Sequence, residues 1–181
     1  MSDGSRTSGP ADYARACVVA SVTARPVPAP PAHPLFGRPA ACFVSLKKHG
    51  QLRGCIGTLE PAESGLGLEI VRNARSAAFH DPRFHRVRPD ELEDLVCSVD
   101  VLGGSERCEV DDLDPKVYGV IVRSGMRRGV LLPDLEGVDE VVQQVDIALQ
   151  KAGIGRGEPY GVERFTVTRY REGDPPRGDG S

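Results

Sequence analysis

One short segment combines a thiol, a guanidinium and two glycines in six residues, Leu52-Arg53-Gly54-Cys55-Ile56-Gly57. Side chains alternate along a strand, so Arg53, Cys55 and Gly57 are expected on one face. A nearby guanidinium favours the thiolate, which is the form of cysteine that acts as a nucleophile or a ligand. The two glycines weaken a strand, a cost often accepted where a ligand or another backbone approaches closely. Cys55 is therefore the first candidate for a catalytic nucleophile.

The same pattern has a structural explanation. Free cysteine is among the most often buried residue types, so Cys55 could be a small core residue. The flanking glycines would then form a bulge in the strand. The sequence leaves both readings of this segment open.

A second group of reactive side chains follows at His80-Asp81-Pro82-Arg83-Phe84-His85. Either histidine, beside a carboxylate, could act as a general base toward the thiol, with Asp81 orienting it or accepting a proton. Arg83 could join Arg53 in holding an anionic group of a substrate. The structural alternative is the end of a helix, where His80 lies near the negative end of the helix dipole and Arg83 is solvated.

Metal sites and phosphate loops lack their usual motifs. His80 and His85 are five residues apart across a proline, and the sequence contains neither HExxH nor CxxC. The glycines of Gly65-Leu66-Gly67 precede a helix, but they lack the preceding strand of a nucleotide-binding fingerprint. We therefore expect no metal site and no cofactor.

Hydrophobic periodicity predicts the elements that position these residues. Helices are expected at residues 11–25, from 61–65 to about 79, and 138–152, and strands at 41–46, 52–59, 95–102, 117–123, 129–132 and 163–170. Five prolines between Pro26 and Pro34 predict an extended connector. Residues 103–115 are expected to form a loop, and Gly50 and Gly153 to be left-handed. Two hairpins and three helices predict an α+β fold with a mostly antiparallel sheet flanked by helices.

Composition limits the classes of function. The chain has 181 residues, 39% of them hydrophobic, which suits one domain with its own core, and residues 1–10 and 173–181 are expected to be disordered. A net charge of −3 gives no reason to expect nucleic acid or a membrane as the main partner. Five cysteines without CxxC pairs, and no apolar signal segment, predict free thiols and a cytoplasmic location. Abundant Gly, Pro, Ala and Arg indicate a bacterial protein from a GC-rich genome.

Together these motifs resemble the AMMECR-type domain family, whose prokaryotic members are often called AmmeMemoRadiSam system protein A. The resemblance rests on LRGCIG and on further segments in the expected order, across roughly residues 12–172. These segments are Phe43-Val-Ser-Leu46, Ala77-Ala78, Asp81-Pro-Arg-Phe84, Cys97-Ser-Val-Asp-Val-Leu102, Gly119-Val-Ile-Val122, Gly129-Val-Leu-Leu-Pro133, Lys151-Ala-Gly153 and Thr168-Arg-Tyr170.

The resemblance implies a two-lobed α+β domain over residues 11–172, with one larger and one smaller lobe and with the cysteine motif lining a cleft. The residues carried over to that cleft are Arg53, Gly54, Cys55, Gly57, Asp81 and Arg83. The family name implies partners of the Memo-like or radical-SAM type. The family pattern does not require His80 or His85, and the segment between Pro133 and Val138 is shorter than usual. A Cys–His pair would therefore be special to this chain.

Two functions remain open at this point. In the first, the protein is a small-molecule enzyme, which could belong to a biosynthetic pathway. The Cys55 thiolate attacks an electrophile of an anionic substrate, in acyl or alkyl transfer, hydrolysis or cyclisation. In the second, the protein is a non-catalytic accessory module, and the glycines of the hairpin let a partner chain lie close.

Overall fold

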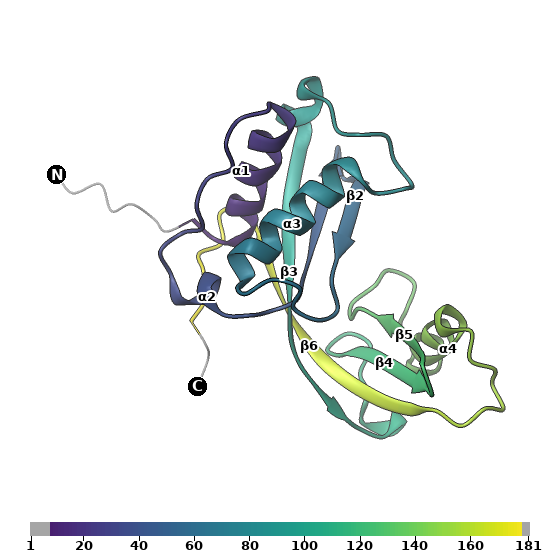
Figure 1. The fold of residues 1–181 in the computed structure, drawn as a ribbon. Coiled ribbons are helices and arrows are strands. Elements are labelled where there is room, and N and C mark those ends of the chain that lie inside the picture. The colour runs from purple at the N-terminus through teal and green to yellow at the C-terminus, as the bar shows by residue number, and fades with distance from the viewer. Residues whose placement is uncertain (1–7, 179–181) are drawn as a thin grey trace. The chain divides into compact units, whose positions relative to one another are not determined.

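The computed structural model describes residues 8–178, and Figure 1 shows their helices and strands. In chain order these are α1 (Pro10–Val22), α2 (Pro34–Gly37), β1 (Cys42–Lys48), β2 (Gln51–Gly57), α3 (Leu66–Phe79), the 3-10 helix η1 (Pro89–Asp94), β3 (Leu95–Arg107), the 3-10 helix η2 (Val110–Asp112), β4 (Gly119–Ser124), β5 (Arg127–Leu131), α4 (Val141–Ala152) and β6 (Gly161–Arg171). Residues 1–7 and 179–181 lie outside the described residues, so their predicted disorder stays a prediction. Pro10 is buried at the start of α1.

The strands form a six-stranded sheet in the order β2-β1-β3-β6-β4-β5. The pairs β1–β2, β1–β3, β4–β5 and β4–β6 are all antiparallel. This confirms the predicted α+β fold with a mostly antiparallel sheet. The chain divides into two compact units: unit 1 comprises Met1–Val101 and Arg169–Ser181, and unit 2 comprises Leu102–Thr168. The strands β3 and β6 contribute residues to both units.

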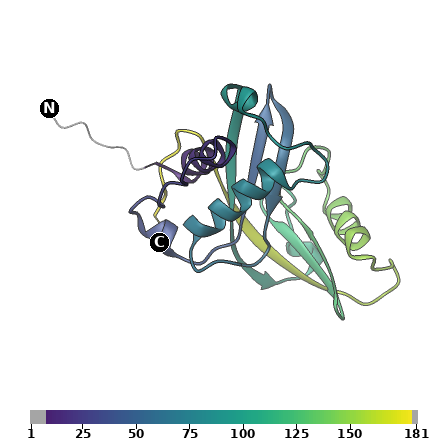
Figure 2. The same ribbon diagram turned by 45° about the horizontal axis from the view of Figure 1, so that its top comes forward.

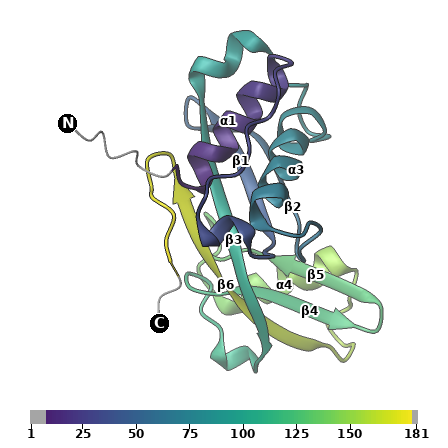
Figure 3. The same cartoon turned by 60° about the vertical axis from the view of Figure 1, so that its left-hand side comes forward.

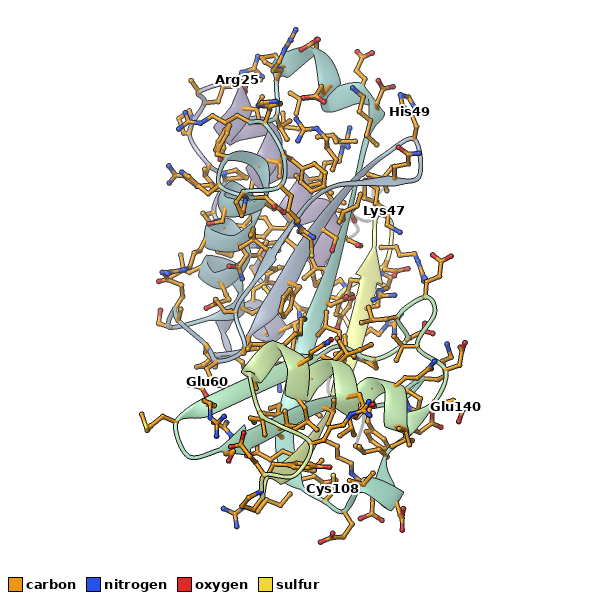
Figure 4. The ribbon with its side chains drawn as sticks, turned by 90° about the vertical axis from the view of Figure 1, so that its right-hand side faces the viewer. Arg25, Lys47, His49, Glu60, Cys108 and Glu140 are labelled. Atoms are coloured by element: carbon orange, nitrogen blue, oxygen red, sulfur yellow. The ribbon has the colours of Figure 1, made fainter. Side chains whose placement is uncertain are left out.

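In unit 1, α1 and α3 pack on one face of β1, β2 and β3, as Figures 2 and 3 show from two directions. Alternate residues of β1, Val44 and Leu46, are fully buried beneath these helices. The hairpin turn carries His49, which Figure 4 places at its tip, and Gly50 has the predicted left-handed backbone with φ of 77°. The predicted proline connector contains no helix or strand before α2, and the Tyr13 hydroxyl donates a hydrogen bond to the Pro28 carbonyl.

Unit 2 has a hydrophobic cluster of its own, formed by β4, β5, α4 and β6. The buried face of α4 includes Val145, Ala148 and Leu149, at the three- and four-residue spacing of an amphipathic helix. Gly153 ends α4 with φ of 66°, as predicted from its position. The helix begins at Val141, three residues later than the apolar pattern suggested.

The two units repeat one order of elements, a hairpin followed by a helix and a strand, which the sequence did not reveal. In each unit the last strand pairs with the first strand of the hairpin, so β2 and β5 are the sheet edges. Each edge strand has a glycine against a helix backbone. A Cβ on Gly54 would lie 2.4 Å from the Ala77 carbonyl oxygen, and one on Gly129 would lie 1.9 Å from that of Ala148. The close packing of α3 is therefore enough to explain why residue 54 is a glycine, and no ligand is needed to explain it.

The predicted loop at residues 103–115 was wrong at its start, because residues 103–107 continue β3. The pair Gly103-Gly104 indicated a loop, since glycine is rare in strands. A Cβ on Gly103 would lie 2.5 Å from Oγ1 of Thr166 on β6, so the absence of a side chain suits the strand at that point. The sequence pattern could not show this contact with a residue 63 positions further along the chain.

We predict that Gly54→Ala lowers the free energy of unfolding by about 1–3 kcal/mol, because its methyl group would displace the backbone of α3. The matched control is Gly104→Ala, also in a strand, where an added Cβ meets nothing within 4 Å. Urea denaturation of both variants measures the difference. Equal stability of the two variants would contradict the close packing of α3 on β2.

Candidate functional site

The candidate site is built on the backbone of Cys55 in the edge strand β2. The Cys55 N–H donates to Oδ2 of Asp81 at 2.9 Å, and Nη2 of Arg83 donates to the Cys55 carbonyl at 3.3 Å. Arg83 also binds the Asp81 carboxylate through Nε at 3.0 Å and Nη2 at 2.8 Å. We call this arrangement the Asp81–Arg83 clamp. It satisfies both backbone groups that Cys55 directs away from the neighbouring strand.

The clamp fixes the charge state of Asp81. Its side chain is 2% exposed, whereas that of Arg83 is 55% exposed. The hydrogen bonds from Arg83 hold the pKa of Asp81 well below its usual range, with a further contribution from the Cys55 N–H, although burial opposes them. A carboxylate with a lowered pKa is a weak base. The geometry therefore favours a positioning role for Asp81 over the predicted role of proton acceptor.

The Cys55 thiol is half-buried and has a hydroxyl beside it. Oγ of Ser45 donates to the Cys55 sulfur at 3.1 Å. Ser45 of β1 pairs with Cys55 of β2 on one side and with Ser98 of β3 on the other. These three side chains form a polar row on the face opposite Val44 and Leu46, which lie beneath the helices. Ser45 is thus the side chain that contacts the sulfur directly.

A bulge changes the predicted alternation along β2. Leu46 pairs with Gly54 and Lys47 pairs with Leu52, so the register skips Arg53. Leu52 therefore shares a face with Lys47, the face that carries the thiol, and it is 41% exposed. Strict alternation had placed Leu52 on the opposite face.

Arg53 binds the segment that follows α3. Its guanidinium donates to Glu91 through Nε at 3.0 Å and Nη2 at 2.9 Å, and to the carbonyls of His85 at 2.9 Å and Arg86 at 3.3 Å. The hydrogen bond from Arg53 lowers the pKa of Glu91 to about 2. The Arg53 side chain is only 14% exposed. Most of its donors are thus used internally, and Glu91 is its main partner.

The two histidines are exposed, and the structure does not bring them to the thiol. The His80 ring lies edge-on to Phe79, with 6.4 Å between ring centroids. Within residues 8–178, neither His80 nor His85 forms a hydrogen bond or ion pair with Cys55 or Asp81. A Cys–His catalytic pair therefore stays a prediction.

The sequence reasoning also missed a buried carboxylate, Glu69 of α3, which is fully buried. It accepts hydrogen bonds from the Thr58 hydroxyl and from the N–H groups of Ala62 at 2.9 Å and Glu63 at 2.8 Å. Glu69 thus fixes the loop that leaves β2 just after the cysteine motif. A signal was present, because Glu69 lies three residues after Leu66 and therefore on the apolar face of a predicted helix.

Two other features are absent from the described part of the chain. No group of three or more His, Cys, Asp or Glu side chains within residues 8–178 is placed to hold a metal ion. Over the same residues, no helix has the length and apolar character needed to cross a membrane.

Comparison with known proteins agrees with the motif resemblance. A family model described as AMMECR1 matches residues 11–173. A protein of Thermotoga maritima is 54% identical over 140 residues, which cover 76% of this chain and 80% of that protein. A Clostridium acetobutylicum protein is 54% identical over 130 residues, 72% of this chain but 28% of that protein. A Methanosarcina acetivorans protein is 40% identical over 114 residues, 60% of this chain and 57% of that protein.

A solved structure shows the same fold. The crystal structure of an uncharacterized protein from Pyrococcus horikoshii, PH0010, superposes with a TM-score of 0.79 at 27% sequence identity. The match covers 92% of this chain and 91% of that one. The similarity therefore extends over both units of the chain.

We predict that Asp81→Asn lowers the free energy of unfolding at pH 7 by about 2 kcal/mol, because hydrogen bonds to a buried charge are lost and the exposure of Arg83 moderates the effect. The pKa of Asp81 is lowered by folding, so its contribution is complete above its unfolded pKa and declines as pH falls below about 4. The difference between wild type and variant should therefore narrow in acid. Chemical denaturation between pH 7 and pH 3 measures it.

The matched control for that measurement is Asp90→Asn. Asp90 pairs with Arg88, but both side chains are largely exposed, at 64% and 73%. Such a pair contributes little, so the control should change stability by less than about 0.5 kcal/mol. If both variants behave alike, the clamp does not stabilise the fold.

Proposed function

Because the chain belongs to the AMMECR1 family and carries the segment LRGCIG at residues 52–57, we propose that it is a small-molecule enzyme whose nucleophile is the Cys55 thiol. The observation that carries this proposal is the Asp81–Arg83 clamp. It holds the N–H and the carbonyl of Cys55 from outside the sheet. Fixing the backbone of a reactive residue fixes the direction of its side chain, which catalysis requires.

The proposed reaction begins with attack of the Cys55 thiolate on an electrophilic carbon of the substrate. A sulfur–carbon bond forms, and the leaving group departs with the electron pair of its bond. A second nucleophile then displaces the sulfur: water gives hydrolysis, another molecule gives transfer, and a group of the substrate itself gives cyclisation. The thiol proton passes to solvent, because neither predicted base, His80 or His85, forms a hydrogen bond with Cys55 within the described residues.

An arginine is available to hold an anionic group of the substrate near the thiol. Arg83 is 55% exposed, and its Nη1 group makes no hydrogen bond within the described residues. Arg53 is less suited to this predicted role, because Glu91 and two backbone carbonyls occupy its donors. The predicted substrate contacts of Gly54 and Gly57 gain no support, because the space beside these glycines is filled by the Ala77 carbonyl and the Phe43 ring.

The other four cysteines provide internal references. Burial raises the pKa of Cys17 to about 11 and that of Cys42 and Cys97 to about 12. Cys108 is half-buried in the loop after β3 (Figure 4), and burial raises its pKa as well. Thiols in such surroundings react slowly, because the thiolate is the reactive form.

We predict that iodoacetamide at pH 7.5 alkylates Cys55 at least tenfold faster than Cys17, Cys42 and Cys97 in the folded protein, and faster than Cys108. Ser45→Ala should slow the reaction of Cys55 and leave that of Cys108 unchanged. Peptide mapping by mass spectrometry over time measures all five rates. If Cys55 reacts no faster than the buried thiols, the proposal that Cys55 is the nucleophile is wrong.

A panel of acyl thioesters, acyl phosphates and activated esters provides the complementary test. Intact mass spectrometry should detect an acyl adduct on wild type that is absent from Cys55→Ala. Cys108→Ala is the control and should still form the adduct. An adduct that survives in Cys55→Ala would contradict the proposal.

The length of one relative favours a second candidate, an accessory module beside a Memo-like or radical-SAM partner. The matched region is only 28% of the Clostridium protein, so further sequence accompanies it there. Leu52 and Val96 flank Lys47 on the face of the thiol and are 41% and 55% exposed. A pull-down from the native host separates the two candidates. If the protein is an accessory module, the double variant Leu52→Ser and Val96→Ser no longer captures the partner, whereas Cys55→Ser still captures it.

A further inference from the structure

A basic pocket of about 450 Å³ opens where the turn end of the β1–β2 hairpin meets residues 83–91. Its lining contains two acidic residues and five basic ones: Lys48, Arg53, Arg83, Arg86 and Arg88. The volume lies in the range of small-molecule sites. All lining residues belong to unit 1, so the pocket is complete within that unit.

Most of the positive charge in this pocket is already neutralised by carboxylates, and the cations that are left over indicate the charge of a ligand. Three ion pairs account for three of the cations: Arg53–Glu91, Arg83–Asp81 and Arg88–Asp90. Lys48 reaches Glu91 at 3.3 Å, but that carboxylate is already paired with Arg53. Arg86 is exposed and makes no ion pair within residues 8–178. Two positive charges therefore lack a counter-charge of their own.

We propose that this pocket binds the phosphate group of a small phosphorylated molecule, with Lys48 and Arg86 as its principal ligands. A phosphate monoester carries about −1.5 to −2 charges near pH 7, which matches the two unbalanced cations. Arginine binds phosphate oxygens through paired N–H donors, and lysine adds a point charge. Arg83 stacks over the Phe84 ring, with 5.4 Å from its guanidinium carbon to the ring centroid. That aromatic ring offers an apolar surface to the rest of the ligand.

The pocket and the Asp81–Arg83 clamp share one residue. Arg83 lines the pocket and also donates to the Cys55 carbonyl, so the bound phosphate lies beside the clamp. Identification of this ligand as the substrate rests on the proposed function. Binding of the phosphate does not, because none of its ligands is the thiol. Sequence reasoning assigned the anion to Arg53 and Arg83 and missed Lys48 and Arg86, whose charges are unbalanced only in the folded chain.

Isothermal titration with inorganic phosphate and with glycerol 3-phosphate, at low ionic strength, tests the site. Arg86→Ala and Lys48→Ala should each weaken binding by about tenfold, the usual effect of losing one hydrogen bond between charged groups. The control is Arg75→Ala, an exposed arginine of α3 outside the pocket, and it should bind as wild type does. Urea denaturation of each variant confirms that it is folded. Succinate, a dicarboxylate of similar charge, distinguishes phosphate recognition from general attraction of anions.

Three results would each overturn the proposal. Binding weaker than ~1 mM by wild type, equal weakening by Arg75→Ala, or tighter binding of succinate would each rule out a phosphate site. The same titration on Cys55→Ala separates this proposal from the enzyme. If the protein binds phosphate but Cys55 is not labelled faster than the buried thiols, the phosphate pocket stands and the nucleophile is ruled out. If wild type binds no phosphate but Cys55 is labelled rapidly, the pocket is ruled out and the nucleophile stands.

Discussion

The outer edge of β2 is the constraint on which the site depends. A strand at the edge of a sheet presents backbone N–H and carbonyl groups that no neighbouring strand satisfies. At Cys55 these groups bind the Asp81–Arg83 clamp. Nearer the turn of the hairpin, Arg53 holds Glu91 and the carbonyls of residues 85 and 86. The segment after α3 is therefore attached to β2 at two points, and this attachment both covers the edge and sets the backbone of the cysteine.

Unit 2 shows the same scaffold without the thiol. Gly129 admits the backbone of α4 to β5, as Gly54 admits that of α3 to β2. The carbonyl of Val130, the residue after Gly129, accepts a hydrogen bond from the Lys151 side chain at 3.3 Å. A glycine against a helix and a cation on the next carbonyl thus belong to the shared architecture. The features particular to unit 1 are the thiol, the Asp81 carboxylate and the Arg53–Glu91 pair, and these are where function is expected.

The sequence predicted those features of the fold that depend on local patterns of residues. The hairpin, the helices and the antiparallel α+β class follow from hydrophobic spacing and from turn residues such as Gly50 and Gly153. Cys55, Asp81 and Arg83, which the resemblance placed in one cleft, are in contact. Their contact runs through the backbone, however, which no residue type reveals. The bulge at Arg53, its pairing with Glu91 and the unbalanced charges of Lys48 and Arg86 depend on distant contacts, so periodicity could not show them.

Native-state hydrogen exchange at the Cys55 amide tests whether the Asp81–Arg83 clamp holds the backbone of the site. An outward N–H on an edge strand exchanges quickly when it faces water, whereas one bound by a buried carboxylate is protected. We predict that the Cys55 amide is protected as strongly as the amides of β1, which lies between β2 and β3, and that Asp81→Asn removes this protection selectively. Rapid exchange at Cys55 in the wild-type protein, or unchanged protection in Asp81→Asn, would contradict it.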